Sequence, residues 1–204
     1  MRLKLAMFAS AVSPASRPAF AAANPDFAVI RCVDFDEVSE DDELARSAVR
    51  AEPYTSFRAR YFEGDGRGIA ILAGAGLVLA HEQPPFGGAA VAQRILVQLP
   101  PERTVWLTNL HLREDGPSEP LEALIRWLID VPPADASLIC GLFDGAREGE
   151  LRRRLESAGY RAVINTSFGA MAAETATCRL YVSGKVRIDR SAADVGASII
   201  TLEV

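Results

Sequence analysis

Two carboxylates stand at the ends of strand-like segments, where a side chain is firmly held and still reaches solvent. Residues 138–145 (LICGLFDG) form an apolar run that stops at a glycine turn and leaves Asp144 at its end. Asp34 closes the apolar run 26–35, two residues beyond Cys32 and so on the same strand face. Either carboxylate could be a metal ligand or a general base. The alternatives are a loop cap for Asp144 and a solvated strand end for Asp34.

A second set of residues that could bind a metal or undergo redox chemistry consists of two cysteines and a histidine. Cys32, Cys178 and His111 lie in separate strand-like runs. If they converge, they would form a soft-metal or redox site, because thiolate and imidazole suit zinc. The set lacks the short Cys-x-x-Cys spacing of common zinc sites. The alternative is a reduced, buried thiol at each cysteine, since three scattered cysteines make no disulfide framework.

The segments that must position these residues alternate between strand-like and helix-like patterns, without a linker or an internal repeat. Helices are expected where a capping serine, apolar spacing of three and four, or a closing glycine occurs, over 39–49, 118–131 and 149–160. Strands are expected over 26–35, 53–62, 68–74, 92–99, 103–112, 138–143, 177–188 and 197–204. Antiparallel pairs with covering helices predict an α/β sandwich of two mixed sheets.

Composition sets limits on the class of protein. With 204 residues, 49% of them hydrophobic, the chain suits one domain over 1–204, and 7% aromatics imply a core of Ala, Val, Leu and Ile. A net charge of −5 gives no general attraction to nucleic acid. No apolar run approaches the ~20 residues of a membrane span. These features predict a cytoplasmic protein without a membrane partner.

The first residues allow two interpretations. The basic start, the apolar patch and the small residues up to position 23 are similar to a signal peptide over 1–23. Polar and apolar residues also alternate from Arg2 to Met7, which is typical of a strand, and Ser13, Pro14 and Arg17 interrupt the apolar patch.

Six segments in register resemble the endonuclease/exonuclease/phosphatase superfamily, the DNase I-like metal-dependent phosphoesterases. The similar segments are NPDFAVIRCVDFDEV, GIAILAG, TNLHL, LICGLFDG followed by ELRRRLESAGY, CRLYVSG and DVGASIITLEV. The resemblance implies a four-layer α/β/β/α sandwich of two mixed, mainly antiparallel sheets. It also implies a divalent cation, a base and charge-stabilising donors at the strand ends. Within it, Asn109 and His111 match the Asn-x-His strand end, where the histidine lies beside the phosphate.

Elsewhere the resemblance places different residue types where the family has its ligands. These are, in chain order, Ala9 or Ser10 for a metal-binding Asn, Arg31 and Cys32 for Gln and Glu, Leu142 and Asp144 for the Asp and Asn of the turn, Cys178 for an Asp, and Ile199 and Ile200 for the terminal Asp and His. Losing several carboxylates removes both the ligands and the charge that offsets dehydration of the cation. Apolar residues would also make the cleft hostile to a phosphate dianion.

The sequence therefore predicts a catalytically degenerate member of this group, a non-catalytic binding or regulatory module. No cofactor is expected in that case, and the partner is an unidentified protein or small molecule, with a homodimer as one alternative. The competing hypothesis is a metal-dependent phosphoesterase, a nuclease or phosphatase, with a rearranged site. Its catalytic residues would be Asn109, His111 and Asp144, its metal ligands Asp34 and Asp144, and its cation Mg²⁺ or Mn²⁺. A structural role for His111 as a satisfied buried histidine is the other alternative.

Overall fold

A computed structural model of the chain describes residues 1–8, 24–34, 55–60, 67–84, 90–112, 119–143, 148–167, 177–194 and 197–204. The described strands are β1 (Arg2–Phe8), β2 (Phe27–Asp34), β3 (Thr55–Arg60), β4 (Arg67–Ala73), β5 (Leu77–Glu82), β6 (Ala90–Leu99), β7 (Arg103–Leu112), β8 (Ala136–Phe143), β9 (Arg161–Ser167), β10 (Thr177–Gly184), β11 (Arg187–Asp194) and β12 (Ala197–Glu203). The described helices are α3 (Glu119–Ile129) and α4 (Glu148–Ser157).

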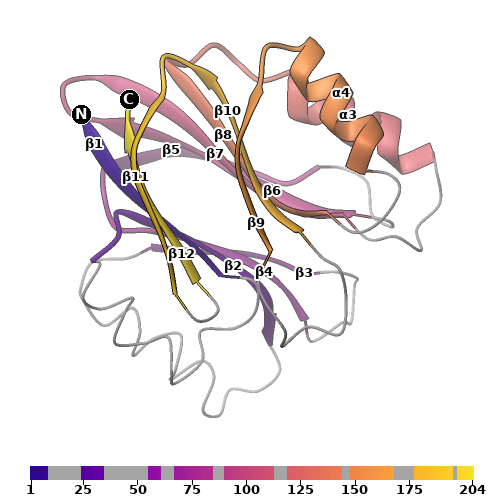
Figure 1. The fold of residues 1–204 in the computed structure, drawn as a ribbon, viewed down its shortest axis with the longest axis horizontal. Coiled ribbons are helices and arrows are strands. Elements are labelled where there is room, and N and C mark those ends of the chain that lie inside the picture. Colours follow the sequence, from indigo (N-terminus) through magenta and orange to yellow (C-terminus); the bar gives the residue numbers. More distant parts are fainter. Residues whose placement is uncertain are drawn as a thin grey trace.

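The strands form two six-stranded sheets that pack face to face (Figure 1). Sheet I has the order β11-β12-β1-β2-β4-β3, and sheet II has the order β5-β6-β7-β8-β10-β9. Within the described strands, β1 with β2 and β7 with β8 are parallel, while the other neighbours are antiparallel. The predicted sandwich of two mixed, mainly antiparallel sheets is confirmed.

The space between the sheets is filled mainly by aliphatic side chains. Leu5 and Val29 of sheet I belong to the same buried cluster as Ile95, Leu107 and Leu138 of sheet II. Among these strands, β2 and β8 are nearly continuous apolar runs, a pattern typical of strands covered on both faces, whereas β1 alternates between exposed and buried residues over Arg2–Leu5. Burial of this layer supplies the main force that holds the two sheets together.

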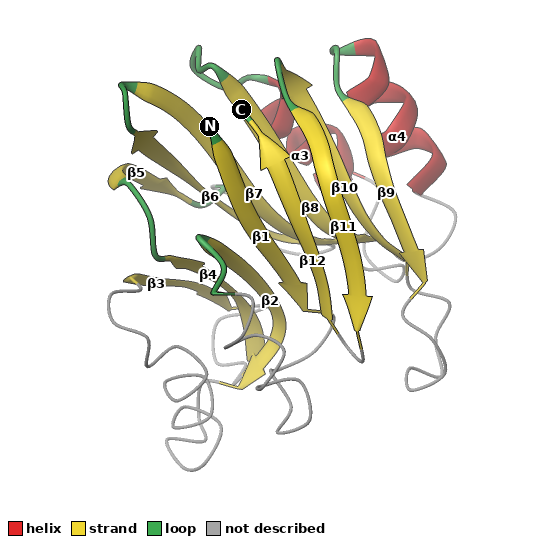
Figure 2. Cartoon of the chain, turned by 60° about the vertical axis from the view of Figure 1, so that its left-hand side comes forward, coloured by secondary structure: helices red, strands yellow, loops and turns green. Residues whose placement is uncertain are grey.

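Helices α3 and α4 cover the outer face of sheet II (Figure 2). Leu124 and Ile125 of α3 and Leu151 and Leu155 of α4 are fully buried against that face. Helix α4 ends at Ser157, and Gly159 just beyond it has a φ of +88°, a conformation that L side chains rarely adopt. The helices predicted over 118–131 and 149–160 are confirmed, and the predicted helix 39–49 lies outside the described residues.

The start of the chain forms a central strand of sheet I. Strand β1 pairs with β12 on one side and with β2 on the other, and Leu3 to Phe8 include five buried side chains, namely Leu3, Leu5, Ala6, Met7 and Phe8. The strand interpretation is thus confirmed over Arg2–Phe8, while residues 9–23 lie outside the described part. Within the described residues, no helix is both long and apolar enough to cross a membrane.

Two differences from the expected strands have local causes. The run 177–188 divides into β10 and β11, because Gly184 has a φ of +82° and reverses the chain. Strand β9 was not expected, and it adds to the edge of sheet II through its ladder with β10. Both differences lie far from the candidate residues on β7.

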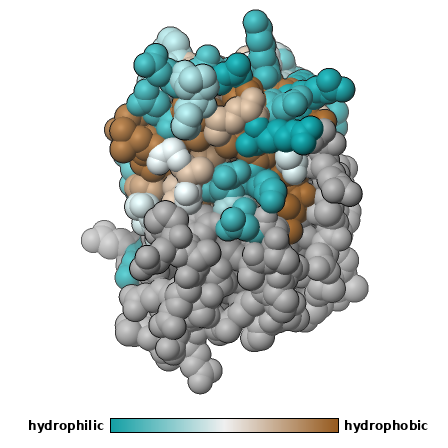
Figure 3. All heavy atoms as spheres, turned by 90° about the vertical axis from the view of Figure 1, so that its left-hand side faces the viewer, coloured by the Kyte–Doolittle hydropathy of each residue, from teal (hydrophilic) through white to brown (hydrophobic). Residues whose placement is uncertain are grey.

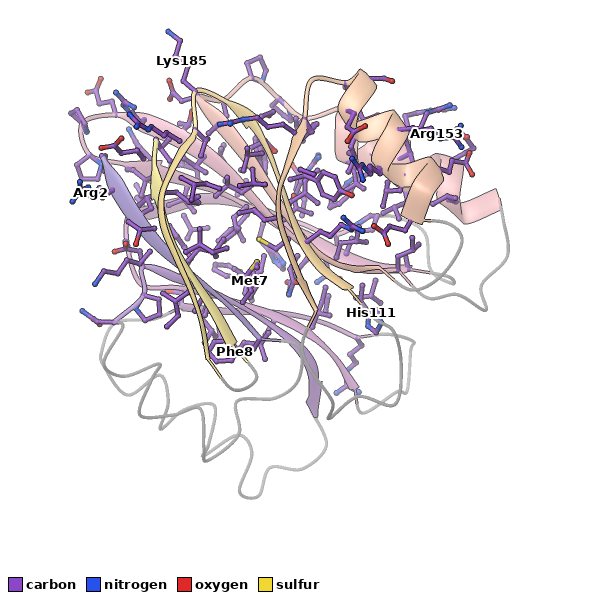
Figure 4. The ribbon with its side chains drawn as sticks, in the orientation of Figure 1. Arg2, Met7, Phe8, His111, Arg153 and Lys185 are labelled. Carbon is purple, nitrogen blue, oxygen red and sulfur yellow. The ribbon has the colours of Figure 1, made fainter. Side chains whose placement is uncertain are left out.

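One end of the sandwich carries the candidate residues, and we call it the mouth. It is formed by the last residues of β2, β7 and β8 and by the first residues of β10 and β12, that is Asp34, Leu112, Phe143, Thr177 and Ala197. Figure 4 shows Phe8 and His111 at this lower end, whereas Lys185 lies at the opposite end.

Candidate functional site

Strand β7 carries the two polar residues that match the Asn-x-His pattern. Asn109 is 0% exposed and His111 is 9% exposed. They are two residues apart on an extended strand and so share the face toward sheet I. Asn109 lies inside the sandwich and His111 lies at the mouth, so the two side chains occupy different environments.

The amide of Asn109 is engaged in holding the two sheets together. Its Nδ2 donates to the carbonyl oxygen of Ile30 in β2 at 3.1 Å and to that of Ala70 in β4 at 2.9 Å. Its Oδ1 is buried and makes no hydrogen bond within the described part of the chain. The donors of Asn109 are therefore committed to structure, and only its Oδ1 acceptor remains.

Gln93 makes a parallel set of bonds beside Asn109. The two residues are direct partners in the ladder of β6 and β7. The Nε2 of Gln93 donates to the carbonyl oxygens of Phe57 and Ile69, each at 3.2 Å, and its Oε1 lies 3.1 Å from Nε2 of His81. We call Gln93 and Asn109 the amide clamp. Sequence reasoning missed Gln93, although a glutamine within the apolar run AQRILVQL was a usable signal.

The rows of residues across sheet II at the mouth contain no carboxylate. The strand ladders of sheet II place His111 in a row of five residues across the sheet. The row consists of Val91, His111, Leu142, Cys178 and Thr166. The next row toward the mouth is made of Ala90, Leu112, Phe143, Thr177 and Ser167. Direct ladder partners have Cα atoms roughly 4.5–5.5 Å apart, so Val91 and Leu142 are the immediate neighbours of His111 within the sheet.

On sheet I, two acidic residues stand at the mouth. The backbone of Asp34 ends β2 opposite Arg67, and the backbone of Asp194 ends β11 opposite Ala197. Opposite charges in register often form a cross-strand pair, which gives Asp34 a structural alternative. Sequence reasoning missed Asp194, and its signal was an acid placed directly before the turn into the last strand.

The proposed match of Ile199 and Ile200 to a terminal Asp-His pair is wrong in position. Both residues lie inside β12, in register with Ala6 and Leu5 of β1. Ile200 is fully buried between the sheets, and Ile199 packs against the apolar cluster on the other face of sheet I. Neither residue lies at the mouth, whereas Asp194 does.

The remaining predicted site residues are only partly placed by the structure. Asp144 lies outside the described residues, one position after the end of β8. The backbones of His111 and Cys178 are separated by β8, so their Cα atoms are about 10 Å apart at ordinary strand spacing. Cys32 is on sheet I. A cluster of Cys32, Cys178 and His111 therefore stays a prediction. Cys140 is buried and reduced, as expected.

The described side chains at the mouth offer few ligands to Mg²⁺ or Mn²⁺. These cations take hard oxygen ligands, and Mg²⁺ usually has one or two protein carboxylates, with water and substrate oxygens completing its shell. Among the described residues, no group of three or more His, Cys, Asp or Glu side chains is placed to hold a metal ion. Of the two side-chain oxygens of the amide clamp, Asn109 Oδ1 is the one that makes no hydrogen bond within the described part of the chain.

A separate polar group lies on the outer face of sheet II, under α4. Arg179 of β10 forms a half-buried ion pair with Glu148 at the start of α4. Burial raises the pKa of the neighbouring Tyr181 phenol, with a smaller opposing effect from Arg179. Tyr181 packs in the cluster beneath the helices, away from the inner face of the mouth. This group stabilises the helix layer and is no part of the candidate site.

The whole architecture resembles solved structures, although no family model and no curated protein matches the sequence. An endonuclease/exonuclease/phosphatase from Beutenbergia cavernae superposes with a TM-score of 0.72 at 13% identity, covering 100% of this chain and 72% of that one. ANGEL2, a 2′,3′-cyclic phosphatase, superposes with a TM-score of 0.74 at 9% identity, covering 99% and 95%. The chain has the endonuclease/exonuclease/phosphatase fold.

Proteins with this fold differ in the chemistry they host. A nitrophorin from Cimex, solved as a ferrous NO complex, matches with a TM-score of 0.59 at 7% identity, covering 98% of each chain. At these identities the likeness establishes the fold alone. Function must be argued from the residues at the mouth.

Proposed function

We propose that this protein is a non-hydrolytic binding or regulatory module built on the endonuclease/exonuclease/phosphatase fold. The observation that carries the proposal is the composition of the two rows across sheet II at the mouth. The row in register with His111 includes one histidine and no Asp or Glu, and the next row, whose Ala90 and Leu112 pack toward the helices on the other face of sheet II, adds no Asp or Glu. A surface of this kind offers little to a divalent cation.

The chemistry of phosphoester hydrolysis is the reason that this composition supports the proposal. The reaction needs a cation held by hard oxygens, an activated water and stabilisation of the charge that develops on phosphorus. The row around His111 instead offers aliphatic, thiol and hydroxyl residue types, and an apolar lining penalises an unpaired phosphate dianion. The donors of Asn109 are already bonded to Ile30 and Ala70 and cannot serve a substrate without weakening the clamp.

The Cimex nitrophorin supports the view that this scaffold also suits ligand binding. That protein was solved with NO bound, on a fold shared with phosphatases. For the present chain, a cytoplasmic binding role follows from composition and reduced cysteines, and a small molecule or a protein would be the bound species. A ligand at the mouth would meet His111 and its neighbours rather than a metal ion.

A rearranged metal-dependent phosphoesterase is the second candidate. One observation favours it: the backbones of Asp34 and Asp194 end strands of sheet I at the same mouth as His111. Together with Asp144 after β8, these residues would supply the carboxylates that a Mg²⁺ or Mn²⁺ site requires. In that case Asn109 Oδ1 and His111 would face the substrate side of the centre.

One assay separates the two candidates. Hydrolysis of a generic phosphodiester and of plasmid DNA is measured with Mn²⁺ or Mg²⁺, then with chelator. The wild type is compared with His111→Ala and, as a matched control, with His81→Ala on β5, the other histidine of the chain. We expect no hydrolysis above the His111→Ala level. Chelator-sensitive hydrolysis that His111→Ala removes and His81→Ala keeps would establish the enzyme.

A further inference from the structure

Strand β5 differs from the other apolar strands because none of its residues is buried. It begins with four apolar residues, Leu77 to Ala80, and its positions alternate between exposed and half-buried. Leu77 is 64% exposed and Leu79 is 49% exposed. Its neighbour β6 has eight of its ten residues buried. An apolar strand with this exposure is typical of a surface that another chain covers.

The two sheets are offset at this side of the molecule. Strand β3, the edge of sheet I, packs over β6 and accepts the Gln93 bond through the carbonyl of Phe57. Strand β5 therefore extends sheet II beyond sheet I, and the ring of His81 lies 4.9 Å from that of Phe57 in β3. A groove of about 620 Å³ opens along this ledge, and no Asp, Glu, Lys or Arg lines it among the described residues. Figure 3 shows hydrophobic side chains reaching the surface of the described half of this side.

The charges on the sheet edges also set β5 apart. The two sheets have four edge strands, and three of them carry arginine: β3 has Arg58 and Arg60, β9 has Arg161, and β11 has Arg187 and Arg190. Charged residues on an edge strand prevent pairing with another edge. The charged residue of β5 is Glu82, and its carboxylate already accepts from Arg94 Nε at 2.7 Å. Arg94 is in turn held over the Trp127 ring at 4.4 Å.

We propose that β5 pairs with β5 of a second copy of this chain, antiparallel across a twofold axis. In a twofold interface the same patch meets itself, so like charges on the patch would oppose one another. Self-pairing of β3, β9 or β11 would bring arginines together. With the twofold axis between Val78 and Leu79, Leu77 lies opposite Ala80 and Leu79 opposite Val78 of the second copy, and the outward backbone groups of the two edges pair. An uncharged apolar strand would fit this groove, and β5 of a second copy is such a strand.

The strength of the contact is limited by the shape of the edge. Strand β5 has six residues, and a bulge at Leu79 interrupts its ladder with β6. Short and bulged edges pair less readily than long flat ones. We therefore expect a reversible dimer whose fraction rises with concentration. This proposal does not depend on whether the mouth is catalytic.

Sedimentation velocity from low micromolar to several hundred micromolar protein tests the proposal. The wild type should shift from the 22.0 kDa of one chain toward twice that mass. Leu79→Lys, at an exposed position, should stay at one chain over the range while keeping its melting temperature. The matched control Ala162→Lys adds the same charge to the exposed edge of β9 and should dimerise as the wild type does.

Two results would overturn the proposal. A wild type that remains a single chain at every concentration would mean that β5 does not pair with itself and that its occupant, if any, is a different molecule. A Leu79→Lys variant that dimerises as strongly as the wild type would place the interface elsewhere. Hydrogen exchange gives an independent readout, since amides of β5 should become protected as concentration rises while those of β9 should not.

Discussion

The interior of β7 and its end at the mouth, two residues apart, differ in what their polar side chains do. At Asn109 both amide hydrogens reach carbonyl oxygens of sheet I in a fully buried site. At His111 the neighbouring positions in the sheet are Val91 and Leu142. The donors of Asn109 are therefore explained by the stability of the sandwich, and a catalytic role for this residue stays a prediction. Of the Asn-x-His pattern, Asn109 is fully buried inside the sandwich and His111 lies at its margin.

The largest loss of stability is expected from Asn109→Asp, a substitution that keeps the shape of the side chain. It would replace two donors by a carboxylate that faces the carbonyl oxygens of Ile30 and Ala70. An uncompensated buried charge costs about 3–5 kcal/mol, so the free energy of unfolding should fall by that amount or the protein should not fold. Urea unfolding monitored by circular dichroism measures it.

The matched control for that variant is His111→Ala. Because His111 lies at the margin of the core, we expect a loss below about 1.5 kcal/mol in the same urea experiment. If His111→Ala cost as much as Asn109→Asp, the contrast between interior and mouth would be lost.

Gln93→Met tests whether the second residue of the amide clamp also stabilises the contact between the two sheets. Methionine fills a similar volume but cannot donate to the carbonyls of Phe57 and Ile69. Leaving these buried acceptors with fewer partners should lower the free energy of unfolding by about 1–3 kcal/mol. A change below about 0.5 kcal/mol by urea unfolding would show that the sheets are held by apolar packing alone.

The smallest effect on stability is the pH dependence expected from Tyr181, whose phenol is buried under α4. Its folded pKa is raised above the ordinary value of 10.0, so the folded state holds the phenol proton more tightly. That contribution to stability is fully present below about pH 10 and is lost as pH rises through the folded pKa. Thermal melts at increasing alkaline pH should therefore show a steeper fall for the wild type than for Tyr181→Phe.

The control for the alkaline experiment is Tyr160→Phe. The Tyr160 hydroxyl donates to Ser137 Oγ at 3.0 Å on the same side of sheet II. Its removal leaves Tyr181 in place, so the steep alkaline fall should persist. If Tyr160→Phe flattened the profile and Tyr181→Phe did not, the assignment to Tyr181 would be wrong.

Much of the fold could be predicted from the sequence because its local signals agree with its packing. In the apolar run 26–35, the consecutive residues Phe27 to Ile30 of β2 are all buried, so both faces of the strand are covered there. Leu121, Leu124, Ile125 and Leu128 are the buried stripe of α3. Strand β9 was missed because an edge strand is specified by the ladder it joins and less by its own pattern. The offset that exposes β5 depends on how two sheets stack, which no local pattern reports.

The candidate site could be predicted only in part. Asn109 and His111 were found, but their different roles depend on depth between the sheets, which sequence spacing does not give. The position of Ile199 and Ile200 was wrong because an apolar run does not reveal where its strand begins. Gln93 gained meaning only from its register beside Asn109, and Asp194 only from the position of its strand end at the mouth. Asp144 stays a prediction, as a turn cap or as a ligand.

The most direct test of the central claim, that the mouth holds no catalytic metal, is a titration with Mn²⁺ followed by electron paramagnetic resonance and by calorimetry. The account predicts free hexaaqua Mn²⁺ throughout and no heat of binding at millimolar metal, with the same result for His111→Ala. Stoichiometric binding of Mn²⁺ that Asp34→Asn or Asp194→Asn removes would contradict the account and identify the protein as a metal-dependent phosphoesterase candidate.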